Sequence, residues 1–208
     1  MSVVKKIQDK FRHGLFFKWF CDQLVHVGIE IVPYYWVKEN FTTSLPEGMK
    51  TEDFKQFNFV ELGYDDMPLI TMNEGDRIVK LDYLQRKIST PGIKCYALKD
   101  AQGQIACFSW FNLNECSSNL RRHPLKPNEA YLFDMYTMKN YRGKNLAVYI
   151  RLKCMEVLKN FGKDTFLSIS EYFNIPSIKF KQKLNAEFLE FNIRVKVFNK
   201  HLYHWRLK

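Results

Sequence analysis

The chemistry of this chain begins with a short basic segment, KNYRGKN (139–145), between an apolar strand-like stretch and a helix-like one. Backbone N–H groups at the start of a helix point outward, and the helix dipole adds positive potential there. Gly143 allows a close approach of the backbone, and Arg142 and Lys144 add positive charge on either side of it. The segment therefore predicts a diphosphate-binding loop, although basic turns of this kind also precede helices that bind nothing.

The elements around this loop follow from the spacing of apolar residues. Apolar side chains at intervals of three and four predict helices, and alternating or β-branched stretches predict strands. In the first half of the chain we expect a helix at 3–27, an extended segment at 28–43, a strand at 57–62 and two helical pieces within 65–88 that break near Gly75. Two strands follow within 94–111 around a turn at 101–103, and a polar connection at 112–128 comes after them. In the last part we expect a strand at 130–138, a helix at 146–161 followed by Gly162, a strand at 165–170, a helix at 176–184 and strands within 188–207. This order predicts a mixed α/β fold around one sheet.

Two short motifs resemble those of a known family. Residues 141–147 (YRGKNLA) resemble the acetyl-CoA motif of GNAT N-acetyltransferases, Arg/Gln-x-x-Gly-x-Gly/Ala. The stretch Asn174-Ile175-Pro176-Ser177 is similar to the family's Asn-x-x-Ser/Ala element, and Leu184-Asn185-Ala186 falls where many members have Leu-Gly-Phe. The resemblance covers roughly residues 57–200. It implies a GNAT-like fold: a mostly antiparallel central sheet with one splayed parallel pair, 130–138 and 165–170.

The resemblance also implies an activity. Members transfer an acetyl group from acetyl-CoA, a co-substrate, to an amine by direct attack in a ternary complex, and no metal is expected. The backbone of Met135 and Thr137 would pair with the pantetheine amide. The layout is similar to that of bacterial members of surface-polysaccharide or amino-sugar pathways, which implies an amino sugar or sugar nucleotide as acceptor; a protein or polyamine stays open. The residues expected to hold acetyl-CoA are Met135, Tyr136, Thr137, Arg142, Gly143, Lys144, Asn145, Leu146, Ala147, Asn174 and Ser177.

The chain departs from the family pattern at two positions. Asn145 replaces the first glycine of the motif, and asparagine tolerates a positive φ better than most residues do. Lys181 stands four residues after Ser177, where many members place a general-acid tyrosine. A lysine could donate the proton, a water could serve instead, or Lys181 could be a solvated helix residue. Both departures keep open a catalytically silent protein that binds CoA or another phosphate ligand.

Two carboxylates are candidates for the base that takes the amine proton. Glu129 matches the place where histone-acetylating members carry a glutamate, and it shares a strand face with 131 and 133. Asp134 has the opposite parity, but a β-bulge in this strand would re-aim it. A buried, unpaired aspartate is costly, so Asp134 should have a partner or a function. Alternatively, Glu129 is exposed at the start of its strand and Asp134 caps a neighbouring loop.

The charge of the chain is concentrated near its end. The net charge is +10, and residues 141–208 hold 14 Lys or Arg against five Asp or Glu. A phosphate-rich ligand, nucleic acid or an anionic membrane could use this charge, or it could be a solvated surface. No RRM, KH or zinc-finger pattern is visible, so nucleic acid is not favoured. The helix at 3–27 has a basic face, which predicts either peripheral membrane contact or packing on its own domain.

Composition limits the remaining classes. With 208 residues and 16% aromatic side chains, the chain is globular rather than disordered. We expect an extension at 1–50 packed on a GNAT-like catalytic domain at 51–208, in a monomer or homodimer. The start of the chain does not resemble a signal peptide, no stretch is long and apolar enough to span a membrane, and the five cysteines lack CxxC spacing. We therefore expect a cytoplasmic location with reduced thiols and no metal site.

Overall fold

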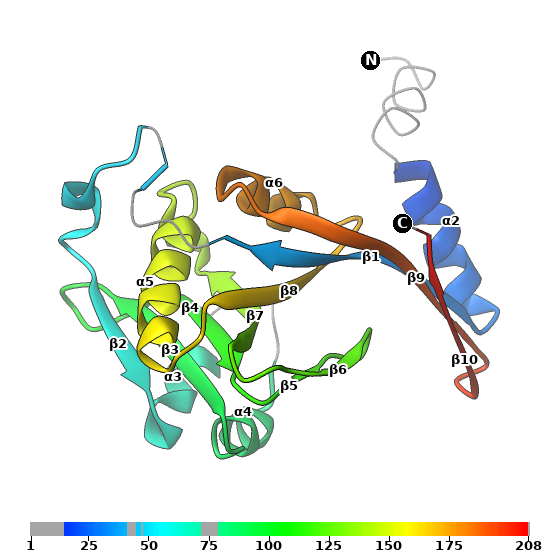
Figure 1. Cartoon of the computed structure of the whole chain (residues 1–208), viewed down its shortest axis with the longest axis horizontal. Coiled ribbons are helices and arrows are strands. Elements are labelled where there is room, and N and C mark those ends of the chain that lie inside the picture. Colours follow the sequence, from blue (N-terminus) through cyan, green and yellow to red (C-terminus); the bar gives the residue numbers. More distant parts are fainter. Residues whose placement is uncertain (1–14, 41–44, 47, 72–78, 208) are drawn as a thin grey trace. The chain divides into compact units, whose positions relative to one another are not determined.

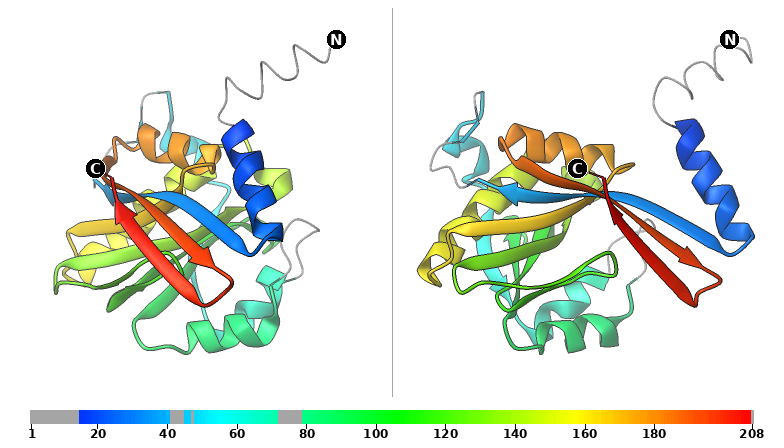
Figure 2. Two further views of the ribbon diagram at one scale, coloured as in Figure 1. Left: turned by 90° about the vertical axis from the view of Figure 1, so that its right-hand side faces the viewer. Right: turned by 45° about the vertical axis from the view of Figure 1, so that its right-hand side comes forward.

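Residues that alternate between two faces build the central sheet of the protein. In this computed structural model, which describes residues 15–40, 45–46, 48–71 and 79–207, the chain divides into two units (Figures 1 and 2). The larger unit comprises residues 38–168 and 180–187, and the smaller unit comprises residues 1–37, 169–179 and 188–208.

The sheet of the larger unit has the strand order β8-β7-β4-β3-β2. Its strands are β2 (Asn58–Leu62), β3 (Ile93–Lys99), β4 (Ile105–Asn112), β7 (Glu129–Thr137) and the first four residues of β8 (Thr165–Glu171). Neighbours are antiparallel except β7 and β8, which pair in parallel from Glu129 opposite Thr165 to Tyr131 opposite Leu167. The predicted mixed α/β fold, with a mostly antiparallel sheet and one parallel pair, is confirmed.

Strand β4 is buried along its whole length because both faces of the sheet are covered. On one face Cys107 and Phe111 meet α5 (Leu146–Asn160), whose residues 146, 150, 154 and 158 recur at helical spacing. On the other face Phe108 and Trp110 pack with apolar residues that include Met67 of α3 (Met67–Thr71) and Leu84 of α4 (Leu81–Ile88). The alternation of β4 therefore separates two core clusters.

Strand β7 contains the β-bulge that the sequence analysis considered. Phe133 lies opposite Trp110 and Tyr136 lies opposite Phe108, so Asp134 and Met135 together face the single residue Ser109. Asp134 has a φ of +52°. The extra residue changes the side-chain parity of the strand, which re-aims Asp134.

Two expectations for connecting segments need correction or restriction. The segment 112–128 was expected to be a polar connection, but it contains a hairpin of β5 (Glu115–Ser117) and β6 (Arg122–Pro124). Its strands are only three residues long, too short for alternation to show in the sequence. The expected break near Gly75 lies outside the described residues; α3 and α4 are the described helical pieces, with short 3₁₀ turns at Thr51–Phe54 and Tyr64–Asp66 before them.

The smaller unit contains α2 (Leu15–His26) and the strand order β10-β9-β1. Its strands are β1 (Ile29–Glu39), whose last two residues belong to the larger unit, β9 (Glu187–Val197), whose first residue does, and β10 (His201–Arg206). Helix α6 (Ile175–Lys183) begins in this unit and ends in the larger one. Of the helix expected at 3–27, residues 3–14 lie outside the described residues.

Two global properties accompany this fold. All five cysteines are free and buried, and burial raises the pKa of the Cys107 and Cys154 thiols to about 12. Within the described parts of the chain, no helix combines the length and apolar character needed to cross a membrane.

Candidate functional site

The loop between β7 and α5 contains two residues with a positive φ before the helix begins. It starts with a 3₁₀ turn at Lys139–Tyr141, after which Gly143 has a φ of +82° and Asn145 a φ of +56°. A Cβ atom on Gly143 would meet nothing within 4 Å, so glycine serves the backbone conformation there and leaves the approach open. Asn145 is the N-cap residue, and its carbonyl accepts hydrogen bonds from the N–H groups of Val148 and Tyr149. Asn145 thus adopts the positive φ that asparagine tolerates.

Three cationic side chains lie in this loop or contact it. Arg142 donates from Nε to the Thr137 carbonyl at 3.2 Å and from Nη2 to the Tyr136 hydroxyl at 3.0 Å, which holds its guanidinium against the end of β7. The Lys144 ammonium lies 5.4 Å from the centre of the Tyr141 ring. Lys183, which the sequence analysis did not select, donates to Asn145 Oδ1 at 3.1 Å. Positive side chains together with the N–H groups of Leu146 and Ala147 favour an anion.

The second half of β7 leads into this loop. The parallel register with β8 covers Glu129 to Tyr131, so the backbone of Met135, Tyr136 and Thr137 lies beyond it. The Thr137 hydroxyl and the Cys107 thiol are 3.2 Å apart, and the Thr137 carbonyl also accepts from Arg142. This carbonyl retains a second lone pair for a ligand amide.

Asp134 forms a partly buried ion pair with Lys87 of α4. The Lys87 ammonium lies 2.7 Å from Asp134 Oδ2, and the two side chains are 10% and 20% exposed, respectively. The same ammonium lies 4.2 Å from the centre of the Trp110 ring and 4.7 Å from that of Phe133. A carboxylate held by an ammonium group accepts a proton less readily than an unpaired one. The partner that the sequence analysis expected for Asp134 is therefore the cation of Lys87.

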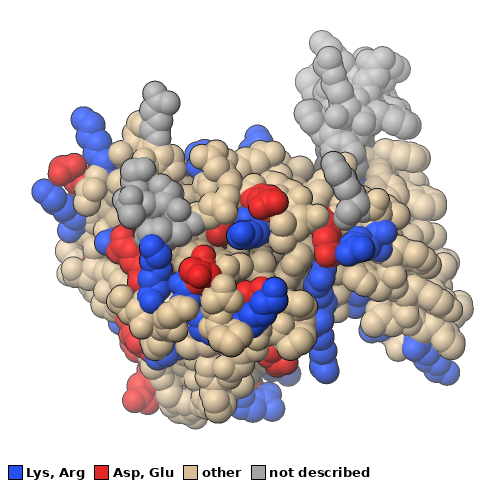
Figure 3. Space-filling view, viewed as in Figure 1, with Lys and Arg blue, Asp and Glu red and all other residues tan. Residues whose placement is uncertain are grey.

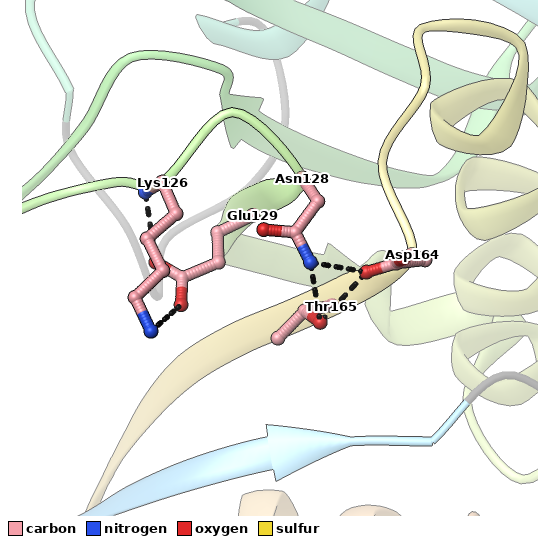
Figure 4. Close-up of polar contacts among 5 residues, drawn as sticks. All are labelled: Lys126, Asn128, Glu129, Asp164 and Thr165. Atoms are coloured by element: carbon pink, nitrogen blue, oxygen red, sulfur yellow. Dashed lines mark hydrogen bonds and ion pairs between the residues drawn. The ribbon is translucent and has the colours of Figure 1, made fainter.

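Glu129 is buried at the start of β7, so the alternative of an exposed glutamate is wrong. Its Oε2 accepts the Lys126 N–H at 3.0 Å, and the Lys126 ammonium is 3.9 Å from Oε1 (Figure 4). Beside it, Asn128 donates to Asp164 at 2.7 Å, which links the starts of β7 and β8. Five strand residues place Glu129 and Asp134 about 16 Å apart along β7, so only one of them can lie beside a given reacting amine.

Lys181 is buried with Glu39 and Arg151, so the reading of a solvated helix residue is wrong. Its ammonium is 3.8 Å from Glu39 Oε1, and Arg151 Nε is 3.2 Å from Oε2 of the same carboxylate. The Lys181 and Arg151 side chains are 3% exposed and that of Glu39 is 0% exposed. Burial lowers the pKa of Lys181 to about 8, and the nearby Glu39 carboxylate acts in the opposite direction by raising it. A group with a pKa of about 8 can hold and release a proton near that pH, as a general acid must.

This depressed pKa predicts how stability changes with pH. The folded-state pKa of about 8 lies below the ordinary 10.5, so the unfolded chain binds the Lys181 proton more tightly. The contribution of Lys181 to the free energy of unfolding should therefore rise between about pH 8 and pH 10.5. We expect the wild type to gain stability relative to Lys181→Met across this range in urea unfolding at several pH values. A difference that does not change with pH contradicts the assignment; Lys55→Met, at an exposed position, is the matched control.

Asn174 and Ser177 lie together at the start of α6 in the smaller unit. Asn174 Oδ1 accepts the Ser177 N–H at 3.2 Å, and the hydroxyls of Ser170 and Ser177 are 2.8 Å apart. Ser170 is 2% exposed. These contacts order the first turn of the helix.

We compared the chain with models of protein families and with solved structures. A model of the acetyltransferase (GNAT) family matches residues 53–186, more than half of the chain. A solved structure of a Drosophila protein has a TM-score of 0.56 at 13% identity, covering 86% of this chain and 57% of that one. A protein from Novosphingobium aromaticivorans assigned to the GNAT family has a TM-score of 0.54 at 18% identity, covering 81% of this chain and 66% of that one. At these identities the two structures are similar in fold alone. No curated protein sequence matches significantly.

Proposed function

Because the chain belongs to the acetyltransferase (GNAT) family, we propose that it transfers an acetyl group from acetyl-CoA to a primary amine. In this reaction the neutral amine attacks the thioester carbonyl, a C–N bond forms and the C–S bond breaks. The amine loses a proton, and the CoA thiolate gains one. The loop between β7 and α5 is the observation that carries this proposal.

The loop fits the anionic part of acetyl-CoA. Gly143 and Asn145 turn the backbone so that the N–H groups at the start of α5 face outward, and Arg142, Lys144 and Lys183 supply positive charge beside them. The diphosphate would lie here, with the pantetheine amide on the backbone of Met135 and Thr137 after the bulge. Asn174 and Ser177 stay predicted contacts of the same ligand.

Proton transfer is assigned to the residues that the sequence selected. Glu129 or Asp134 takes the amine proton. Glu129 is favoured because its pair with the exposed Lys126 is longer, at 3.9 Å, than the 2.7 Å pair of Asp134 with Lys87. Lys181 donates a proton to the leaving thiolate. Its pKa of about 8 suits this step, because an ordinary thiol has a pKa near 8.5.

The acceptor is proposed to be an amino sugar or a sugar nucleotide. Aromatic side chains near the bulge support this, because aromatic faces bind the apolar faces of sugars and bases. Phe133 is partly exposed, and it stacks on the buried Tyr131 with ring centres 5.3 Å apart. A panel of amino sugars, sugar nucleotides, peptides and polyamines, scored by release of CoA thiol, tests the assignment. Turnover with peptides or polyamines and none with sugars contradicts it.

A catalytically silent CoA-binding protein is the second candidate. The observation that favours it is the burial of Lys181 beside Glu39, which gives that lysine a structural partner. Saturable binding of acetyl-CoA without thiol release from any acceptor in the panel would support this candidate.

Other properties expected from the sequence stay predictions. They are the division into an extension at 1–50 and a catalytic domain at 51–208, a monomer or homodimer, a cytoplasmic location and peripheral membrane contact through the N-terminal helix. Size-exclusion chromatography and fractionation of cells measure the second and third of these.

Reversing the charge of Arg142 should weaken acetyl-CoA binding by tenfold or more. Arg142→Glu removes one charge-assisted contact, worth about 1.5–3 kcal/mol, and places a carboxylate beside a diphosphate. Calorimetric titration with acetyl-CoA measures the change. Arg86→Glu is the matched control, because Arg86 is exposed on α4 and makes the same change in charge.

The result requires that the variant is folded, because Arg142 also holds the end of β7. The thermal unfolding temperature and the near-ultraviolet circular dichroism of both variants check this. Unchanged affinity in a folded Arg142→Glu protein contradicts the placement of the diphosphate at this loop.

A further inference from the structure

Exposed apolar side chains are concentrated in the smaller unit. Among the described residues, 19 large apolar side chains are exposed, and 14 of them lie in this unit. The unit holds only about a third of the chain. Large contiguous apolar surface usually marks a site of interaction. Figure 3, in which charged side chains are coloured, shows a mostly uncharged surface over α2 and β10.

The hairpin of β9 and β10 presents two aromatic side chains to solvent on one face. Tyr203 lies opposite Val195 and Trp205 lies opposite Ile193, so these four side chains share one face. The rings of Tyr203 and Trp205 are stacked, with centres 5.7 Å apart, and each side chain is 49% exposed.

On the opposite face of the same hairpin, polar residues of β9 are buried, whereas the residues of β10 are exposed. Asn192 is 0% exposed and Arg194 is 9% exposed, and Arg194 pairs with Glu30 at 3.0 Å. His204, opposite Arg194, is hydrogen-bonded to the buried Tyr34 hydroxyl at 2.6 Å. A two-stranded ribbon normally buries its apolar face and exposes its polar one. In β9 this order is reversed, and Tyr203 and Trp205 of β10 are left as exposed aromatic surface.

Helix α2 also exposes aromatic side chains. Phe16, Trp19 and Phe20 recur at intervals of three and four, which places them on one face, and they are 45%, 52% and 45% exposed. Cys21 of the same helix is buried, and the ring of Phe17, which is 42% exposed, lies 5.7 Å from that of Phe173.

Charge decides between the partners that could cover these faces. The residues of the smaller unit include 11 Lys or Arg against five Asp or Glu. Lys200 lies in the turn of the hairpin, and Lys196 and Arg206 lie on the face opposite its aromatics. In the sequence of α2, Lys18 stands between the aromatics and pairs with Asp22 at 3.2 Å. A second copy of the chain would bring like charges together, whereas an anionic lipid surface would attract them. Tyr and Trp side chains with neighbouring basic residues are the composition found at membrane interfaces.

We propose that the smaller unit binds the surface of an anionic membrane through the Tyr203–Trp205 face of the β9–β10 hairpin, with the Phe16–Trp19–Phe20 face of α2 as a second contact. The aromatic rings enter the headgroup region, and the basic side chains contact lipid phosphates. The proposal does not depend on acetyl transfer.

Binding to lipid vesicles tests this proposal. The full chain is sedimented with vesicles of phosphatidylcholine alone and with vesicles of equal parts phosphatidylcholine and phosphatidylglycerol. We expect binding to the anionic vesicles that weakens steeply with salt, and at least tenfold weaker binding to the neutral ones. The double variant Tyr203→Ser with Trp205→Ser should bind anionic vesicles at least tenfold more weakly than the wild type. The double variant Tyr64→Ser with Phe161→Ser removes two exposed aromatics of the larger unit and should bind as the wild type does.

Three results would overturn the proposal. They are failure of the wild type to bind anionic vesicles, equal binding by the hairpin variant, and equal loss in the control variant. Sedimentation velocity examines the alternative occupant: a wild-type dimer that becomes monomeric in the hairpin variant, without vesicle binding, would make this face a subunit interface. Unchanged acetyl-CoA titration and thermal unfolding of the larger unit confirm that the variants are folded.

Discussion

Glu129→Gln should lower turnover by about 10²–10⁴-fold while leaving acetyl-CoA affinity intact, because it removes the base and keeps the shape of the side chain. Asp134→Asn should have a much smaller effect on turnover, because Asp134 already neutralises Lys87. About 16 Å of strand separates the two carboxylates, so they are alternatives. A pH–rate profile with an active acceptor measures the difference, and the acidic limb should vanish only in the variant that lacks the base.

A double variant separates the structural role of Asp134 from its catalytic role. Asp134→Asn leaves Lys87, whose side chain is 10% exposed, over Trp110 without its carboxylate partner, so the single variant should lose stability. The double variant Lys87→Met with Asp134→Asn should regain most of that stability. If the double variant is stable but inactive, Asp134 is the base. If all the variants turn over at near the wild-type rate, neither carboxylate is the base and a water relay replaces them.

Glu39→Gln should lower the free energy of unfolding by about 3–5 kcal/mol, the usual effect of removing one partner from a buried ion cluster. Glu39 lies between Lys181 and Arg151, and all three side chains are buried in the larger unit. Without the carboxylate, two cations remain together away from water. Unfolding in urea at pH 7 measures the loss. Glu52→Gln, at an exposed position, should change stability little.

A second substitution distinguishes loss of charge balance from loss of packing. Glu39→Gln combined with Lys181→Met leaves Arg151 as the single buried cation, so this double variant should be more stable than Glu39→Gln alone. Equal stability of the two variants would contradict a cluster in which Glu39 offsets both cations. Full stability of Glu39→Gln would contradict the cluster itself.

Several features of the site could be predicted from neighbouring residues alone. The order Arg142, Gly143, Lys144, Asn145 predicted a loop before α5, and the positive φ of Asn145 follows from the tolerance of asparagine for that conformation. The strands β3, β4, β7 and β8 were predicted because alternation and β-branched residues are local signals. The same local reasoning missed the three-residue strands β5 and β6, since neither is long enough to alternate.

The tertiary structure alone decided which charges meet. Lys87 and Asp134 are 47 residues apart, and Glu39, Arg151 and Lys181 come from three separate elements. Their contacts depend on the order and register of strands and on where the helices cross them. In the hairpin of β9 and β10, the alternation of polar and apolar residues was visible in the sequence, but which face is buried was not. Alternation sets the parity of a strand, whereas only packing against other elements decides which parity faces inward.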